Sequence, residues 1–298
     1  MSVNLELVSE HRCHGGWQRY YQHQSETIGL PMRFSVFLPQ QTQATTAKED
    51  SAQPMGATKR PVLIYLAGLT CTEDTFTTKA AAQQYAAEHG LVLVTPDTSP
   101  RGAGASGEED HWDFGTGAGF YLDATTPDFS QHYRMESYVA HELFDIVTTV
   151  LPGDAKRVGI FGHSMGGHGA LVLALRHPDK FKSVSAFAPI SAPTQCPWGE
   201  KAFTGYLGED RKAWEQYDAS CLMASQDQAP YPQGILIDQG LSDQFLEREL
   251  HPHLFEEACA KVGQPLTLRR HEGYDHGYFF IMSFIQDHIE HHAKQLGA

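Results

Sequence analysis

Basic residues are scarce in this chain: 22 Lys and Arg stand against 36 Asp and Glu, so its 298 residues carry a formal net charge of −14. A surface of that sign repels phosphate backbones and anionic lipid headgroups, and we expect it to bind neither nucleic acid nor membrane. Long hydrophobic runs are also lacking, because no apolar stretch approaches the roughly 18 residues of a membrane-spanning helix. Residues 1–10 show neither the basic nor the apolar region of an export signal, so we expect a cytoplasmic protein.

Cysteine is sparse as well, with five residues and no Cys-x-x-Cys pair. This count and spacing predict reduced thiols rather than a disulfide framework or a cysteine zinc site. Three histidines do have metal-ligand spacing, since His288, His291 and His292 stand at i, i+3 and i+4. No carboxylate pattern of a metalloenzyme accompanies them, and we expect no metal site.

Buried strands and helices alternate along the chain after residue 61. Continuous apolar runs such as 62–66 and 91–94, separated by helical stretches, are typical of a parallel sheet covered on both faces. Right-handed crossovers would join these units into one doubly wound α/β sheet. The predicted strands are 62–66, 91–94, 158–161, 183–187, 235–238 and 266–270, and the predicted helices are 79–89, 134–150, 167–177, 245–262 and one from Tyr278.

The N-terminal region has a different pattern. The aromatic run 17–21 and the alternating run 32–38 predict antiparallel strands that begin the sheet. Segment 40–60 is polar, lacks periodicity and exceeds the usual loop length of about 12 residues, so we predict an exposed loop insertion. No repeat or linker divides the sequence, and we expect a single domain over residues 1–298.

The most specific motif is Gly162-His-Ser-Met-Gly166, a Gly-x-Ser-x-Gly pattern between a predicted strand and a predicted helix. This is the context of a nucleophile elbow, a turn so tight that only glycines fit beside the serine. The turn exposes Ser164 Oγ as a candidate nucleophile. It also places the Met165 N–H at a helix N-terminus, where it can stabilise an oxyanion.

Serine alone is a weak nucleophile, so an acid and a base must follow it in the order Ser, Asp or Glu, His. His271 ends the last strand and His276 lies in a glycine-flanked loop, from which a side chain reaches the serine more readily. Asp238 ends strand 235–238 and Asp243 lies in the loop beyond it. Loop geometry favours Asp243 and His276 without excluding the other pair.

A second oxyanion donor is expected from the loop after an earlier strand. That loop follows strand 62–66, and we predict that the Leu69 N–H is the donor. The aromatic residues Trp112, Phe114 and Trp198 are predicted to wall a small acyl pocket.

Longer motifs surround these residues. They are Ala67-Gly-Leu-Thr-Cys-Thr72, Pro96-Asp-Thr-Ser-Pro-Arg-Gly102, Trp112-Asp-Phe-Gly-Thr-Gly-Ala-Gly-Phe-Tyr121, Gly162-His-Ser-Met-Gly-Gly-His-Gly169, Cys196-Pro-Trp198 and Glu272-Gly-Tyr-Asp-His276. In these motifs the chain resembles the S-formylglutathione hydrolases, a family also called esterase D. The resemblance runs from about His11 to Lys294 and covers nearly the whole chain.

The resemblance implies an α/β-hydrolase fold and cleavage of the thioester S-formylglutathione to glutathione and formate, the last step of glutathione-dependent formaldehyde detoxification. It also implies a homodimer that needs no cofactor. By position, the family's functional residues fall on Ser164 as nucleophile, Asp243 as acid, His276 as base, and Leu69 and Met165 as oxyanion donors. Cys71 is expected near the nucleophile.

A broad short-chain carboxylesterase is the alternative function, because a serine triad defines acyl transfer to water and leaves the acyl donor open. Glutathione is anionic, so its binding to an acidic protein requires local cations. The candidates are Lys79, Arg101, Arg134 and Lys201.

Overall fold

The computed structural model describes residues 4–40 and 58–298, so most of the predicted insertion at 40–60 lies outside the described residues. Within them, nine strands form one sheet in the order β1-β2-β3-β5-β4-β6-β7-β8-β9. The strands are β1 (Glu6–Cys13), β2 (Gly16–Gln24), β3 (Pro31–Leu38), β4 (Arg60–Leu66), β5 (Val92–Pro96), β6 (Gly153–His163), β7 (Phe181–Phe187), β8 (Ile235–Gly240) and β9 (Leu266–His271).

The sheet has an antiparallel part and a parallel part. β1, β2 and β3 pair antiparallel, and β3 joins β5 antiparallel. All pairs from β5 across to β9 are parallel. The central strand β4 is buried from Pro61 to Leu66, as its unbroken apolar run requires when both faces are covered. The predicted mostly parallel sheet with antiparallel N-terminal strands is confirmed.

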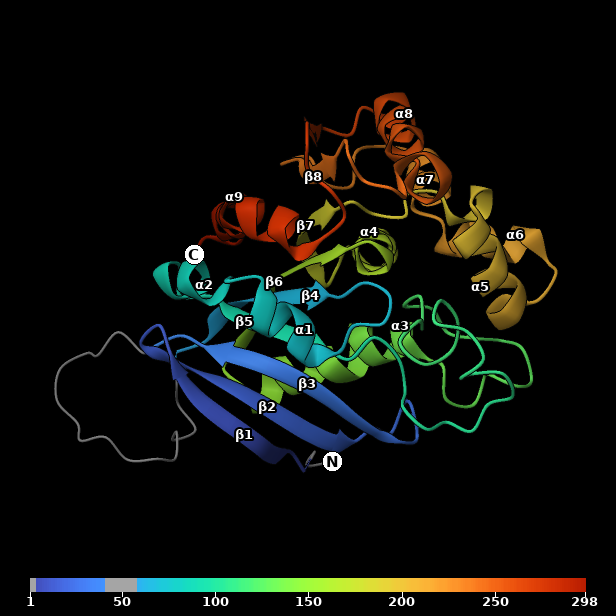
Figure 1. Ribbon diagram of the computed structural model, residues 1–298. Coiled ribbons are helices and arrows are strands. Elements are labelled where there is room, and N and C mark those ends of the chain that lie inside the picture. Colours follow the sequence, from blue (N-terminus) through green and yellow to red (C-terminus); the bar gives the residue numbers. More distant parts are fainter. Residues whose placement is uncertain (1–3, 41–57) are drawn as a thin grey trace, which may run out of the picture.

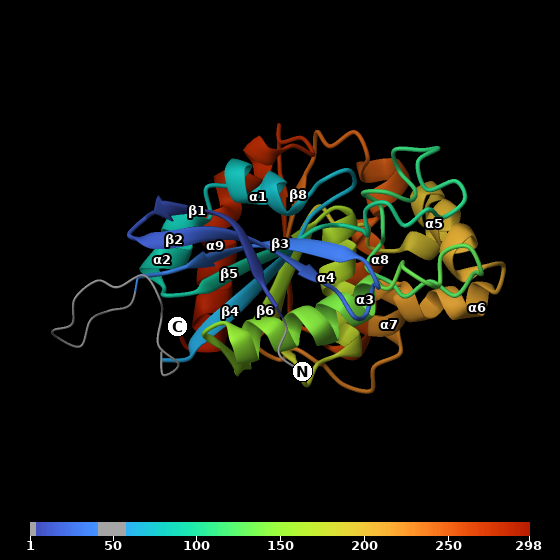
Figure 2. The same cartoon turned by 90° about the horizontal axis from the view of Figure 1, so that it is seen from below.

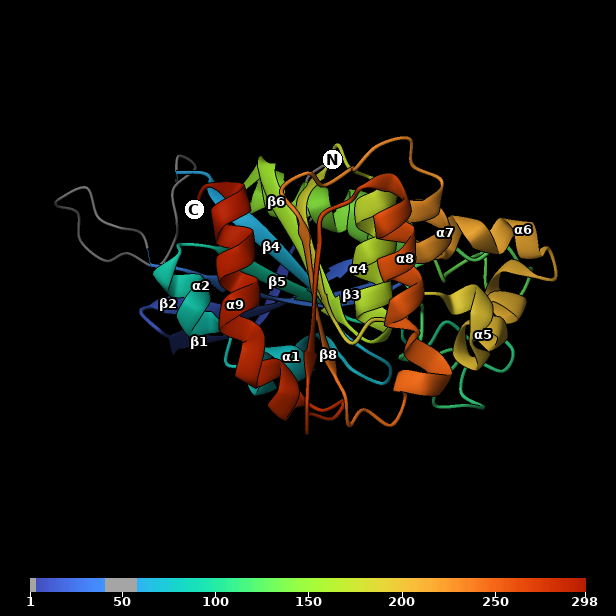
Figure 3. The same cartoon turned by 90° about the horizontal axis from the view of Figure 1, so that it is seen from above.

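Helices cover both faces of the parallel part. α1, α2 and α9 lie on one face, and α4, α7 and α8 lie on the other (Figure 1, Figure 3). The antiparallel strands form one edge of the sheet, nearest the viewer in Figure 2. The helices are α1 (Glu73–Lys79), α2 (Gln83–Glu88), α3 (Met135–Ser137), α4 (Met165–Arg176), α5 (Pro197–Leu207), α6 (Arg211–Trp214), α7 (Ala219–Ala224), α8 (Pro252–Val262) and α9 (Tyr278–Leu296). The π and 3₁₀ segments are η1 (Tyr138–Leu143), η2 (Ile146–Val150), η3 (Pro193–Gln195), η4 (Glu215–Tyr217) and η5 (Leu246–Leu250).

Two predicted helices are interrupted. The helix expected over 79–89 is instead the end of α1 followed by α2, because Ala81 adopts φ +55° and breaks the helical hydrogen-bond ladder. The helix expected over 245–262 is divided at His251, whose φ is +45° just before Pro252 begins α8. Proline disfavours helical backbone in the residue before it, which explains the second break.

Candidate active site

Ser164 occupies the sharp turn between β6 and α4. Its backbone has φ +57° and ψ −120°, a conformation that side-chain-bearing residues rarely adopt. A Cβ on Gly166 would collide with the carbonyl oxygen of Leu66, and one on Gly162 would collide with that of Gly166. The flanking glycines are therefore required by contact, as the elbow motif predicts. The Met165 amide opens α4, and the first-turn amides of a helix have no acceptor within it.

His276 contacts Asp243 in the loop region beyond β8. Its Nδ1 lies 2.5 Å from Asp243 Oδ2, and the Asp243 carboxylate is buried. The Phe245 amide donates to the other oxygen at 2.9 Å, and Gln239 Nε2 lies 3.3 Å from Oδ2. These contacts fix the carboxylate, which in turn orients the imidazole.

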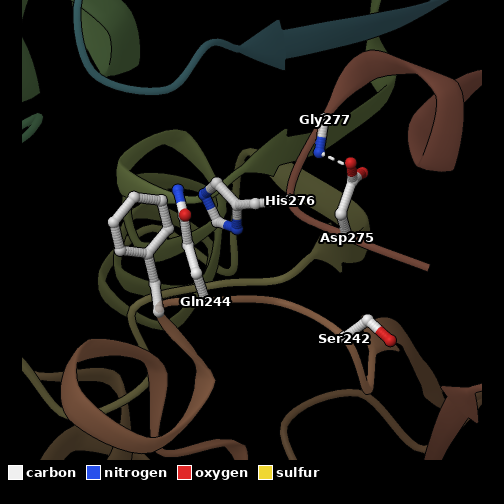
Figure 4. Close-up of a pocket in the computed structure, with 6 residues that line it drawn as sticks. Ser242, Gln244, Asp275, His276 and Gly277 are labelled. Carbon is white, nitrogen blue, oxygen red and sulfur yellow. Dashed lines mark hydrogen bonds between the residues drawn. The ribbon is translucent and has the colours of Figure 1, made fainter. Parts of the chain in front are cut away.

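His276 and Ser164 line one cavity of about 160 Å³. The imidazole packs between Phe245, at 4.9 Å between ring centroids, and His163, at 4.4 Å. A larger and more polar cavity of about 360 Å³ lies beside it and shares His276 and Phe245. Figure 4 shows His276 and Gln244, which both line this second cavity. The Gly277 amide donates a hydrogen bond to Asp275 Oδ1. Ser164 lines only the smaller of the two cavities.

The alternative acid and base are bound elsewhere. Asp238 accepts two hydrogen bonds from Arg269, at 2.6 and 2.5 Å, and lies 3.2 Å from both His271 Nε2 and His288 Nε2. Burial alone would raise the pKa of Asp238, but the hydrogen bonds from His288, Arg269 and His271 outweigh it and hold this pKa well below its usual range. Neither Asp238 nor His271 lines the cavity that contains Ser164.

The loop that follows β4 lies directly against Ser164. A Cβ on Gly68 would come within 3.3 Å of both Ser164 Cβ and His163 Nδ1. Among the described residues, none accepts a hydrogen bond from the Leu69 amide, and Leu69 lines the cavity with Ser164. The amide is therefore available to a ligand bound at Ser164.

Aromatic side chains line the cavity, and Trp112 and Trp198 are among them. Trp198 is 7% exposed and packs on Phe245 at 4.7 Å, whereas Trp112 is 58% exposed and meets Trp198 edge to face at 5.9 Å. The prediction for Phe114 is wrong. Its ring stacks on Tyr206 at 4.6 Å, away from the lining, because it fills an aromatic cluster of the core instead.

Cys71 also lines the cavity, and burial raises the pKa of its thiol. Sequence reasoning missed three further lining residues, His163, Phe245 and Tyr278. His163 had a signal, since it directly precedes Ser164. Phe245 and Tyr278 had none, because only the packing of their loops brings them to the cavity.

The candidate cations have mixed surroundings. Arg101 is paired with Asp97, and Lys201 is paired with Asp113. Lys79 Nζ lies 5.7 Å from the centroid of the Tyr278 ring, at one wall of the cavity. Among the four candidates, Lys79 is therefore the cation that lies near a side chain of the cavity. Arg134 is exposed.

The three C-terminal histidines lie on α9 against the sheet. His288 Nδ1 and His292 Nε2 both lie 2.8 Å from Ser185 Oγ, and His291 Nε2 lies 3.2 Å from the Val184 carbonyl oxygen. In the described part of the chain, no group of three or more His, Cys, Asp or Glu side chains is arranged to hold a metal ion. No helix in that part is both long and apolar enough to cross a membrane.

The fold and this site define a hydrolase of the α/β-hydrolase class. An esterase family model, described as "Putative esterase", matches residues 25–291. S-formylglutathione hydrolases from Rattus norvegicus and Paracoccus denitrificans are 49% and 48% identical to the chain, over 99% and 100% of its length and 100% of theirs. A solved S-formylglutathione hydrolase from Agrobacterium tumefaciens superposes with a TM-score of 0.90 at 46% identity, covering 98% of this chain and all of that one. The chain belongs to the S-formylglutathione hydrolase family.

Proposed function

We propose that this chain hydrolyses the thioester bond of S-formylglutathione, releasing glutathione and formate. Ser164 Oγ attacks the formyl carbon while His276 takes its proton, and Asp243 stabilises the imidazolium. The carbon–sulfur bond then breaks, which leaves a formyl-serine, and the departing glutathione sulfur takes the proton from His276, so that the imidazole is neutral again. His276 next activates a water molecule that attacks the formyl-serine, releases formate and restores the Ser164 hydroxyl.

The observation that carries this proposal is the contact between His276 Nδ1 and Asp243 Oδ2 in the loops that bring His276 to the Ser164 cavity. The amides of Leu69 and Met165 are the proposed donors to the oxyanion. A thiol has a pKa near ~8.5 and leaves without much help from an acid, so oxyanion stabilisation provides most of the catalysis.

The size of the cavity supports a small acyl group. About 160 Å³ walled by Trp112, Trp198 and Cys71 suits formyl better than a long acyl chain. We propose that the larger neighbouring cavity leaves room for the peptide part of the leaving group.

We make three further proposals, on the domain organisation, the oligomeric state and the cellular compartment of the protein. We propose a single domain, since one sheet takes strands from Glu6 to His271. We also propose a homodimer, which the family resemblance implies, and a cytoplasmic location. All five cysteines are free, which agrees with a reducing compartment. Sedimentation velocity tests the dimer, and cell fractionation tests the compartment.

The decisive experiment compares kcat/KM for S-formylglutathione, S-lactoylglutathione and 4-nitrophenyl acetate, with Ser164→Ala as the blank. We expect a preference for the formyl thioester of about 10³ or more. Comparable values for all three substrates would instead indicate a short-chain carboxylesterase. Activity no higher than that of Ser164→Ala would contradict the hydrolase mechanism.

A further inference from the structure

Two loops meet at the edge of the sheet where Leu69 lies. β4 leads into loop 67–72, which carries Leu69, and its parallel neighbour β5 leads into the segment 97–121. The carboxyl ends of neighbouring parallel strands lie side by side, so the second segment is placed to support the first. The hydrogen bonds between them define how that support is built.

The segment 97–121 contacts loop 67–72 at three backbone groups. Tyr121 Oη donates to the Ala67 carbonyl oxygen at 2.9 Å, and the Gly117 carbonyl accepts from the Thr70 amide at 2.9 Å. The Cys71 carbonyl accepts two hydrogen bonds from this segment. Thr98 Oγ1 donates to it at 2.6 Å and Arg101 Nη2 at 3.1 Å.

The backbone of this supporting segment is strained. Phe120 and Tyr121 have φ of +48° and +51°, although both carry bulky side chains, and both are fully buried. Such conformations are costly and persist only where the surrounding structure imposes them, which is common beside active sites. In this case the unusual backbone places the Tyr121 hydroxyl under Ala67.

Arg101 is oriented by a buried carboxylate. Its Nε and Nη2 bind the two oxygens of Asp97 at 3.0 and 2.6 Å, and the same Nη2 reaches the Cys71 carbonyl. A guanidinium in this fork geometry is rigid, and its charge is already paired. This arrangement suits a structural anchor better than a site for an anionic substrate.

We propose that Tyr121 and Arg101 are positioning residues that hold loop 67–72 at both ends, so that the Leu69 amide stays aimed at the oxyanion on Ser164. The inference rests on the proposed function in one respect, namely that the Leu69 amide acts as an oxyanion donor. Tyr121 fixes the loop at Ala67, and Arg101 fixes it at Cys71.

The test uses Tyr121→Phe and Arg101→Met, each with a matched control. Tyr231→Phe removes another buried hydroxyl, which lies 2.8 Å from the Ala174 carbonyl oxygen and 3.1 Å from that of Phe181. Neither of these partners lines the cavity. Arg157→Met removes an arginine that also binds one carboxylate and one carbonyl, with a side chain 34% exposed against 39% for Arg101. The controls therefore report the structural cost alone.

We expect kcat for both S-formylglutathione and 4-nitrophenyl acetate to fall about tenfold in Tyr121→Phe and Arg101→Met, less than the 10²–10³-fold loss when an oxyanion donor is removed outright. KM is expected to stay within about twofold, because the substrate-binding groups are untouched. The affinity for a small alkyl boronic acid, whose Ser164 adduct places an oxygen toward Leu69, should fall by the same factor as kcat/KM. The control variants should lose thermal stability alone.

Unchanged kcat in both variants, or equal losses in the controls, would overturn the proposal. A higher KM for S-formylglutathione with normal kcat in Arg101→Met would also overturn it, by making Arg101 a substrate-binding cation. If the wild-type chain cleaves the nitrophenyl ester and not S-formylglutathione, the proposed substrate fails. The ester kinetics would then still decide the role of the two anchors.

Discussion

His276 Nδ1 lies 2.5 Å from Asp243 Oδ2, and in a second acid–histidine pair His271 Nε2 lies 3.2 Å from Asp238 Oδ1. In both pairs the histidine follows the acid by 33 positions in the sequence. β8 and β9 run side by side in parallel, with Asp238 opposite Arg269 and Gly240 opposite His271, and the loops beyond them are joined by the Ser242 amide, which donates to the Tyr274 carbonyl oxygen at 2.9 Å. Spacing alone therefore cannot identify the functional pair. Their surroundings differ, since the first pair includes a side chain of the Ser164 cavity and the second belongs to a buried network with Arg269.

Asp243→Asn tests this distinction. The substitution keeps the shape of the side chain but removes the charge that stabilises the His276 imidazolium, so we expect kcat to fall on the order of 10³–10⁴-fold. Thermal stability should change little by comparison. The measurement is steady-state kinetics with S-formylglutathione beside a thermal melt of the same preparation.

Asp238→Asn is the matched control. It removes the buried partner of Arg269 and His288, and breaking such a pair costs about 3 kcal/mol in the free energy of unfolding. We expect a lower melting temperature with kcat of the folded fraction close to wild type. A kcat loss in Asp238→Asn larger than that in Asp243→Asn would reverse the assignment.

Trp198→Ala is expected to change acyl selectivity. The buried ring forms one wall of a cavity of about 160 Å³, so its removal makes room for longer acyl groups and loosens the fit of formyl. We expect the ratio of kcat/KM for 4-nitrophenyl butyrate to that for the acetate to rise about tenfold, which corresponds to the ~1–3 kcal/mol of a pocket methylene contact. Trp112→Ala, at an exposed ring, serves for comparison and should change this ratio less. An unaltered ratio in Trp198→Ala would mean that the ring does not form part of the acyl pocket.

The sequence predicts the sheet well and its helices less well. Strands such as 62–66 and 235–238 are continuous apolar runs, and burial on both faces produces that signal directly. β1 was not predicted, because it is an edge strand with most side chains exposed and no alternation. The break at Ala81 was missed because alanine favours helix and only tertiary packing imposes its left-handed backbone.

The site was predictable where local backbone demands particular residues. A Cβ on Gly162 would collide with Gly166 in the same turn, and a Cβ on Gly166 would collide with Leu66 of the neighbouring strand β4. The elbow can be read from the motif because the tight turn requires glycine at both of these positions, which flank Ser164 closely in the sequence. The lining by Phe245 and Tyr278 depends on how distant loops pack and has no local signature. The same holds for the support of loop 67–72 by Tyr121, which joins residues 54 positions apart.

Cys71 is expected to react slowly with alkylating reagents at neutral pH. Burial raises the pKa of its thiol above the usual range, and the thiolate is the reactive form. The alkylation rate with iodoacetamide should therefore increase close to tenfold per pH unit from pH 7 to 9. Activity should fall in parallel, because Cys71 lines the Ser164 cavity. Cys71→Ser should abolish the inactivation, whereas complete alkylation of Cys71 with full retained activity would contradict its place beside the acyl group.

Acid is expected to destabilise the protein well before its carboxylates titrate. Burial lowers the pKa of several imidazoles, which belong to His163, His168, His288 and His292. In the unfolded chain these groups have a pKa near ~6.5, so below that pH the unfolded state binds more protons than the folded one, and the free energy of unfolding decreases. Each such histidine contributes a slope of up to ~1.4 kcal/mol per pH unit until the pH reaches its folded pKa.

His168 is the group in which this linkage can be measured. Burial lowers its pKa to about 4, so its contribution spans the pH range from about 6.5 down to 4. Replacement by glutamine removes the titrating group and retains a polar atom for the Phe120 carbonyl, which His168 Nε2 contacts at 3.1 Å. In urea unfolding experiments, the free energy of unfolding of the wild type should decrease as the pH is lowered from 6.5 to 5. In His168→Gln this decrease should be smaller by up to ~1.4 kcal/mol per pH unit, which is the contribution of one proton taken up on unfolding. Equal slopes for the two proteins would mean that His168 takes up its proton in the folded state as readily as in the unfolded chain.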